Sequence, residues 1–285
     1  MRLLVMSDLH LSKKPWQVRK TLKMGESADA VLLVGDLTND GTPEQMALMQ
    51  QSIAEVLPDT PVLAVPGNHD YPHFPSPMIR EGFCDFEALQ DSLLARQPYP
   101  YVLDDSGAWA VRMGEIEVIG LNCVWYWRRF KFKDGAQLHW LEKHLETSDA
   151  GWHIILCHAP LLAHNPKRSD TKPYLSRDEK LQSILDSHRN IIFISGHTHV
   201  SMESPVDCVE YDAARNNIYI NDGSIRPTTR LTTDGLPEDE PADGNVVDLV
   251  IEYHKITITA ISTKTGQGIG KYSFVSQIAK MSPSR

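Results

Sequence analysis

The sequence predicts an α/β fold with a parallel core sheet. Short apolar runs of four or five residues, rich in Val, Ile and Leu, recur along the 285-residue chain, as is typical of strands buried on both faces. Segments with helical features separate the first of these runs, and this alternation implies right-handed crossovers between parallel strands. Most runs are followed within three residues by Asp, Asn or His. Polar side chains therefore gather at the carboxyl ends of the strands, where α/β proteins bind ligands.

Strands and helices alternate through the first hundred residues. The expected strands are 3–6, 30–34 and 61–65, and the expected helices are 16–28, 43–57 and 87–96. The second helix has the clearest start, because Thr42 suits the N-cap and Pro43 suits the first helical position. Pro-rich residues 71–86 form a long connection, which is either a rim over a binding site or an ordinary surface excursion.

The rest of the chain is richer in strands. A hairpin is expected over 108–112 and 116–120, helices over 137–145 and 178–188, and strands over 152–157, 191–195, 217–220, 246–251 and 256–260. Residues 125–135 interleave aromatic and basic side chains, which either contact a nucleotide-like ligand or pack on the fold with their cations in water. Residues 231–245 form an exposed acidic loop. We expect one domain over residues 1–277 and a frayed tail at 278–285.

Composition narrows the possible partners. With 28 Lys and Arg against 37 Asp and Glu, the formal net charge is −9, which argues against binding to long nucleic acids or anionic membranes. The four cysteines are scattered without a CxxC pair, which indicates reduced thiols. No apolar run reaches the length of a membrane span, and the start of the chain lacks the apolar core of a secretory signal. We therefore expect a cytoplasmic protein.

Five of the expected strands end in side chains that bind metals. They supply Asp8, His10, Asp36, Asn68, His69, His158, His197 and His199. This mixture of imidazole and carboxylate suits manganese, iron or zinc better than magnesium or calcium. The set is too large for one four-coordinate ion and fits two. Any one of these residues is explained equally well as a turn or core residue, but that explanation would have to hold independently at five strand ends.

The same residues form blocks that recur together in a known family. In chain order they are Asp8-Leu9-His10, Gly35-Asp36, Gly67-Asn68-His69-Asp70, His158 and Gly196-His197-Thr198-His199. This order strongly resembles the calcineurin-like metallophosphoesterase superfamily, and its class III cyclic-nucleotide phosphodiesterase branch most closely. The resemblance implies a four-layer α/β/β/α sandwich of two mixed β-sheets flanked by helices. It also implies two metal ions that activate a hydroxide for attack on the phosphorus of a small phosphoester.

The resemblance also implies a role for each residue. One metal would be held by Asp8, His10, Asp36 and His199; the second would be held by Asp36, Asn68, His158 and His197. Asp36 would bridge the two ions, and His69 would be the general acid for the leaving oxygen. Many family members carry Asp three residues after the bridging aspartate, where this chain has Asn39 followed by Asp40. Asp40, Asp70 or neither would then orient His69.

Other readings of the same residues stay open. A 3',5'-cyclic nucleotide is the expected substrate, and a phosphomonoester or a nucleotide pyrophosphate is the alternative within the superfamily. A non-catalytic metal-binding scaffold is the alternative of another class, although no ligand of the family pattern is missing. Residues 221–224 resemble a further family block near the site. Arg226, just beyond them, is read as a surface arginine rather than a phosphate ligand.

Overall fold

The computed structural model describes most of the chain. The residues outside the description are 72–78, 127–128, 133–134, 170–174, 176–177, 205, 227–228, 254 and 276–285. The expected tail at 278–285 therefore lies outside the described residues, as does part of the Pro-rich connection. None of the described helices combines the length and apolarity that crossing a bilayer requires.

The first sheet has six strands in the order β15-β14-β13-β1-β2-β3. Its parallel half consists of β1 (Arg2–Met6), β2 (Ala30–Val34) and β3 (Val62–Val65), and its antiparallel half of β13 (Asn245–Glu252), β14 (Lys255–Ser262) and β15 (Gly268–Val275). All residues of β2 and β3 are buried, as their continuous apolar runs predict. The parallel half carries three of the predicted metal-binding blocks at its carboxyl ends.

The second sheet has seven strands in the order β11-β12-β10-β9-β6-β5-β4. Its strands are β4 (Tyr101–Leu103), β5 (Trp109–Met113), β6 (Ile116–Gly120), β9 (Trp152–Leu156), β10 (Ile191–Ser195), β11 (Val209–Asp212) and β12 (Asn217–Asn221). The four central strands β12, β10, β9 and β6 run parallel, and antiparallel strands complete both edges. The remaining two blocks follow β9 and β10.

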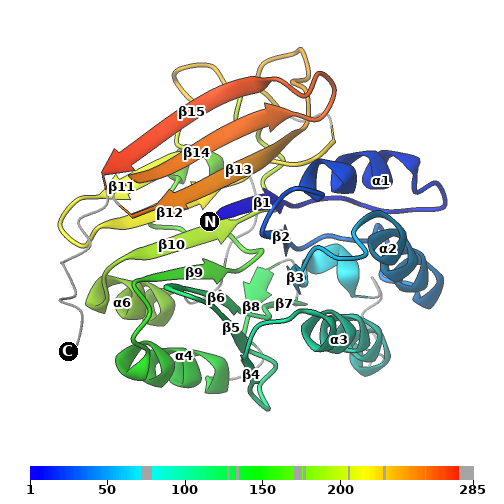
Figure 1. Cartoon of the computed structure of the whole chain (residues 1–285). Helices are drawn as coiled ribbons and strands as arrows, with labels where there is room; N and C mark the ends of the chain where they lie inside the picture. The colour runs from blue at the N-terminus through cyan, green and yellow to red at the C-terminus, as the bar shows by residue number, and fades with distance from the viewer. Residues whose placement is uncertain are drawn as a thin grey trace.

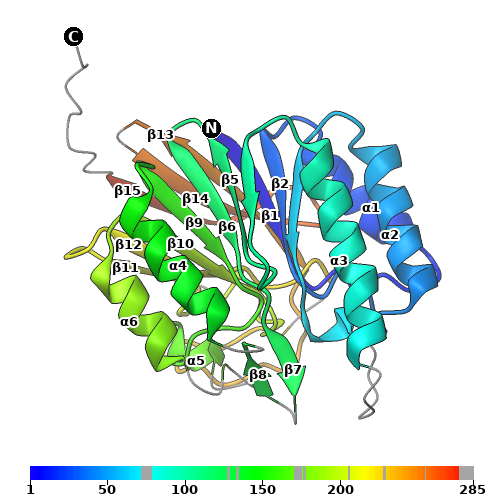
Figure 2. The ribbon, with the colours of Figure 1, turned by 90° about the horizontal axis from the view of Figure 1, so that it is seen from below.

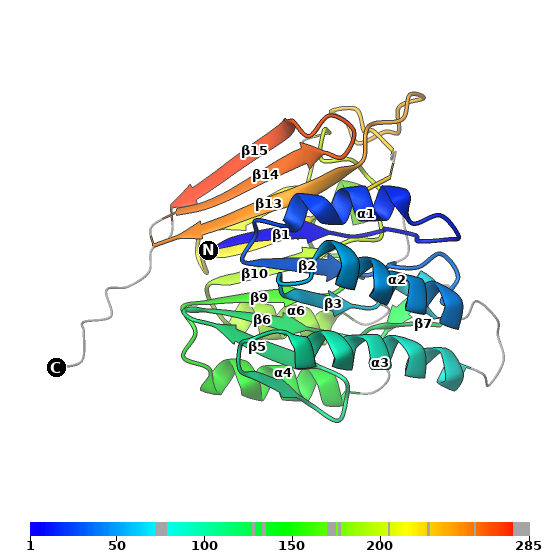
Figure 3. The same ribbon diagram turned by 45° about the vertical axis from the view of Figure 1, so that its right-hand side comes forward.

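Helices cover the outer face of each sheet (Figures 2 and 3). The first sheet is covered by α1 (Trp16–Leu22), α2 (Pro43–Val56) and α3 (Ile79–Arg96), and the second by α4 (Ala136–Thr147) and α6 (Glu179–Ser187); α5 (Pro166–Ser169) is a single turn. One apolar cluster fills the space between the sheets, joining residues such as Leu32 and Val118, and two more lie under the helices. The predicted four-layer α/β/β/α sandwich is therefore confirmed (Figure 1).

Several local expectations need correction. The first helix ends in a 3-10 turn at Gly25 rather than at residue 28. The third helix begins at Ile79, so the second half of the expected 71–86 loop is helical. The sequence did not predict strands β4, β11 and β15. All three residues of β4 are exposed, and an exposed edge strand lacks the alternation of apolar and polar residues by which a strand is recognised. By contrast, Thr42 caps α2 as expected, accepting a hydrogen bond from the Gln45 backbone N–H.

Gly120 provides a test of the packing between the sheets. It lies opposite Trp109 in the β5–β6 pair, and a Cβ added at Gly120 would overlap the buried indole. Gly120→Ala should therefore lower the free energy of unfolding by about 1–3 kcal/mol, measured by urea denaturation. Gly268→Ala is the control, because a Cβ there meets only ordinary contacts, the nearest at 3.5 Å from Thr259. Equal stability of the two variants would contradict this packing.

Candidate metal centre

The carboxyl ends of both parallel strand sets deliver the predicted ligands to one place. One group consists of Asp8, His10, Asp36 and His199, and the other of Asp36, His158 and His197. Within each group, one ligand atom from every residue lies within 4.8 Å of the others. Asp36 belongs to both groups. The sequence could place each residue at the end of a strand, and the packing of the two sheets brings those ends together.

An unusual backbone conformation turns these side chains inward. The φ angle is positive at Asp8 (54°), His10 (45°), Asp36 (51°), His197 (69°) and His199 (54°). L-residues rarely adopt this left-handed conformation, which costs about 1–3 kcal/mol at each position. Five strained residues at one place indicate that the fold sacrifices stability to aim these side chains.

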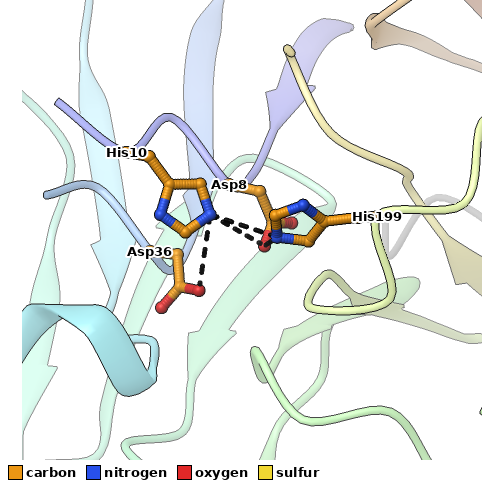
Figure 4. Close-up of side chains that lie close together, drawn as sticks. All are labelled: Asp8, His10, Asp36 and His199. Atoms are coloured by element: carbon orange, nitrogen blue, oxygen red, sulfur yellow. Dashed lines mark hydrogen bonds and ion pairs between the residues drawn. The ribbon is translucent and has the colours of Figure 1, made fainter. Parts of the chain in front are cut away.

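The first group is tightly packed (Figure 4). His199 Nε2 lies 2.9 Å from Asp8 Oδ1 and 3.1 Å from His10 Nε2. His10 Nε2 in turn lies 3.8 Å from Asp36 Oδ2. Two imidazole nitrogens and two carboxylates thus face a common point.

The second group lies against the same carboxylate from the other sheet. His158 Nε2 is 3.4 Å from Asp36 Oδ2, and the rings of His158 and His197 are 5.3 Å apart. The amide of Asn68 is also buried, at the end of the turn that follows β3.

Atoms left without hydrogen bonds show that these residues suit metal ions. Asp8 Oδ1, Asp36 Oδ2, Asn68 Oδ1 and His158 Nε2 are buried and have no hydrogen-bond partner among the described residues. A buried polar atom without a partner costs about 1–3 kcal/mol. The carboxylate and amide oxygens and the imidazole nitrogen among them are of types that bind transition metals. The residues therefore fit the metal site that the family pattern implies.

The opposite atoms of the same side chains are held by the protein. His158 Nδ1 donates to the carbonyl oxygen of Val34 at 2.7 Å, which leaves Nε2 facing Asp36. Asp36 Oδ1 accepts the backbone N–H of His69 at 2.8 Å. Asp8 Oδ2 accepts the backbone N–H of His197 at 3.1 Å. These three predicted ligands are thus each oriented by a hydrogen bond to the backbone.

Burial and mutual charge set the protonation of the group. Burial raises the pKa of Asp8, but the nearby imidazoles of His199 and His158 together lower it by more, so the pKa falls to about 2. Burial lowers the pKa of His10 to about 4 against the opposing Asp36, and burial followed by His158 lowers that of His197 to about 3. Burial lowers the pKa of His158, but Asp36 outweighs it and raises the value to about 10. Asp8, His10 and His197 are thus already in the forms that bind metals.

His69 is held by a backbone group. Its Nδ1 donates to the carbonyl oxygen of Asn39 at 2.7 Å, in the orienting position for which Asp40 and Asp70 were the candidates. Asp70 instead accepts the backbone N–H groups of Gly67, Leu37 and Thr38 at 2.8–3.1 Å, and so fastens two strand-end loops together. The ring of His69 lies 4.6 Å from that of His10, at the side of the first group.

The structure also reveals contributors that the sequence did not single out. The ring of Phe130 is fully buried, 4.7 Å from that of His197. Phe130 lies on a hairpin of β7 (Val124–Tyr126) and β8 (Arg129–Lys131), and its neighbours Arg129 and Lys131 are exposed. Of the two alternatives for this segment, these three residues fit the one in which the aromatic ring packs on the fold and the cations face water. The one sequence signal for this buried ring is that Phe130 alternates with the basic residues Arg129 and Lys131.

Arg226 is not the surface arginine that the sequence suggested. It is half-buried, and its guanidinium donates to the carbonyl oxygens of Leu9 (3.2 Å) and His10. These contacts fasten the loop that carries the first block.

The structure is thus a four-layer sandwich whose strand ends gather imidazoles and carboxylates, the side chains that bind transition metals. A family model described as calcineurin-like phosphoesterase matches residues 1–201, well over half of the chain. The chain therefore belongs to the calcineurin-like phosphoesterase family.

Relatives of this chain carry phosphodiesterase names. A probable glycerophosphodiester phosphodiesterase GpdQ from Arcobacter nitrofigilis is 23% identical over 172 residues, which is 60% of this chain and 56% of the relative. A probable cyclic nucleotide phosphodiesterase from Vesicomyosocius okutanii is 25% identical over 177 residues, which is 61% and 64% of the two chains. The matched part thus spans less than two thirds of either relative.

A solved structure shares the fold. Purple acid phosphatase PPD1 from yellow lupin seeds superposes with a TM-score of 0.64 at 15% identity, covering 96% of this chain and 53% of the phosphatase. Identity this low shows a common fold only.

The shared position of Asp36 leads to a stability prediction. Adding Mn²⁺ to the metal-free protein should raise its Tm, because a metal bound only by the native state stabilises it. Asp36→Ala should remove most of this increase, since the carboxylate belongs to both groups. The control Asp29→Ala removes an exposed carboxylate elsewhere and should keep the full increase. Scanning calorimetry with and without Mn²⁺ measures both; a full Tm increase in Asp36→Ala would contradict the shared role.

Proposed function

We propose that this protein hydrolyses a small phosphodiester with two transition-metal ions that share Asp36. The observation that carries the proposal is the pair of buried ligand groups with Asp36 in common. Two metal ions at one site suit displacement at phosphorus, because they can hold both the attacking and the leaving side of the reaction. The phosphodiesterase names of the two relatives support a diester as the substrate.

The proposed ligand sets follow the two groups. Asp8, His10, Asp36 and His199 hold the first ion; Asp36, Asn68, His158 and His197 hold the second. Asn68 joins the second set because its buried Oδ1 has no hydrogen-bond partner among the described residues. Imidazoles, carboxylates and one amide favour manganese, iron or zinc.

When bound, the metal ions would polarise the phosphoryl oxygens and acidify the attacking water. The protein's own residues would supply the positioning and the leaving-group proton. Asp36 sets the spacing of the two sites, because its Oδ1 is fixed by the backbone and its Oδ2 faces both groups. His69 acts as the general acid in its doubly protonated form: Nδ1–H stays bound to the carbonyl oxygen of Asn39, and Nε2–H passes its proton to the leaving oxygen, which leaves a neutral imidazole.

A 3',5'-cyclic nucleotide is the proposed substrate within the diester class, and the name of one relative supports it. The Mn²⁺-loaded protein should be tested against cyclic nucleotides, glycerophosphodiesters, bis-nitrophenyl phosphate, dinucleotides and phosphomonoesters. Preferential hydrolysis of diesters is expected, and it should stop when a chelator is added. Hydrolysis of phosphomonoesters alone would replace the diester by a monoester as the substrate. Hydrolysis of pyrophosphate-linked dinucleotides alone would replace it by a nucleotide pyrophosphate. If the protein binds metal but hydrolyses none of these substrates, the alternative of a non-catalytic metal-binding scaffold would replace the proposed function.

The role of His69 can be separated from metal binding. An alkoxide leaving group needs a proton and a nitrophenolate hardly does, so a general acid matters only for the first; its contribution is typically about 10²–10⁴-fold. His69→Ala should therefore lose most of its kcat on a cyclic nucleotide while keeping much of its kcat on a nitrophenyl diester. The control is His139→Ala, which removes an exposed imidazole on α4 and should change neither rate.

The two alternatives for His69 predict different results. If His69 only attracts the phosphate electrostatically, both substrates should lose rate equally. If it is a metal ligand, elemental analysis should find less metal bound to His69→Ala than to the unaltered protein.

A further inference from the structure

The hydroxyl of Ser7 joins two buried carboxylates from different sheets. Ser7 follows β1 and precedes the predicted ligand Asp8, whereas Asp222 follows β12 in the second sheet. Ser7 Oγ lies 2.5 Å from Asp8 Oδ2 and 2.6 Å from Asp222 Oδ1. The three residues are at most 1% exposed. This contact links a predicted metal ligand to a residue in neither ligand group.

The backbone fixes the position of Asp222. Its N–H donates to the carbonyl oxygen of Ser195 at 2.9 Å, and its carbonyl oxygen accepts from Asn245 Nδ2 at 2.6 Å. Ser195 ends β10, the strand that leads into the Gly196–His199 block. Asp222 is therefore anchored to the same strand ends as the ligands of the second sheet.

The two carboxylate oxygens of Asp8 have different contacts. Oδ2 accepts two hydrogen bonds, one from the Ser7 hydroxyl and one from the backbone N–H of His197. Oδ1 faces His199 Nε2 at 2.9 Å, on the side of the first ligand group. Losing the contact on Oδ2 would free the carboxylate to rotate.

We propose that Asp222 is a positioning residue for the first metal ion, acting through the Ser7 hydroxyl to hold Asp8 with Oδ1 toward the metal. The proposal rests on the ligand sets of the proposed function. Residues that orient metal ligands from behind typically contribute about 10–100-fold to metal affinity. Because Asp222 acts through Ser7, removing either residue should have the same effect as removing both.

Calorimetric titration of the metal-free protein with Mn²⁺ tests this directly. Ser7→Ala and Asp222→Leu should each weaken one binding event by about 10–100-fold, the same event that His10→Ala abolishes. The double variant should be no weaker than Ser7→Ala alone. Asp222→Asn should stay within about threefold of the unaltered protein, because its amide can donate to or accept from Ser7 Oγ.

A matched control separates positioning from general damage to the fold. Asn217 is a fully buried polar residue at the other end of β12, and Asn217→Leu should lower stability without weakening either Mn²⁺ event. If Asp222→Leu fails to fold, Asp222→Ala, which adds no bulk, takes its place.

The outcomes distinguish the two proposals. Two Mn²⁺ events of unchanged affinity in Asp222→Leu, or a double variant whose loss is the product of the single losses, would overturn the role of Asp222 and leave the proposed function standing. Failure of the unaltered protein to bind two Mn²⁺ would instead overturn the proposed function.

Discussion

The buried carboxylate of Asp36 is the interaction on which the junction between the two sheets depends. It is 1% exposed, accepts a backbone hydrogen bond at Oδ1, and faces imidazoles from both sheets at Oδ2. A buried charge costs several kcal/mol unless opposite charge and hydrogen bonds compensate it. The imidazoles of His10 and His158 reach Asp36 Oδ2 from different sheets, so neither sheet alone assembles the site. The chemistry of the site thus requires the packing of the whole sandwich.

The core of the fold compensates for the strain at this junction. Five left-handed residues and four buried atoms without hydrogen bonds are each unfavourable on their own. Three apolar clusters, one between the sheets and one under each helical layer, hold the strand ends in place. Strained residues that persist in a well-packed fold typically mark functional sites. Here five of the positive-φ residues lie in the turns that carry the two ligand groups, directly after the strands.

The sequence predicted what is encoded locally. Apolar runs such as 30–34 and 191–195 are strands with those bounds, and the Thr42–Pro43 start of α2 is a local capping signal. Every residue of the two ligand groups was predicted, because each stands directly after a strand. The contact of Ser7 with Asp222 was not, since 215 residues separate them and no periodicity links β1 to β12. The contact of Phe130 with His197 and the backbone partner of His69 were missed for the same reason: both depend on how distant loops pack.

The central claim is that two metal ions share one carboxylate, and electron paramagnetic resonance of the Mn²⁺-loaded protein tests it most directly. Two Mn²⁺ ions joined through Asp36 are close enough to couple magnetically, so the protein loaded with two equivalents should give the spectrum of an exchange-coupled pair. At one equivalent or less, the signal of an isolated ion should contribute. A fully active protein that shows only isolated Mn²⁺ at every loading would contradict the shared site.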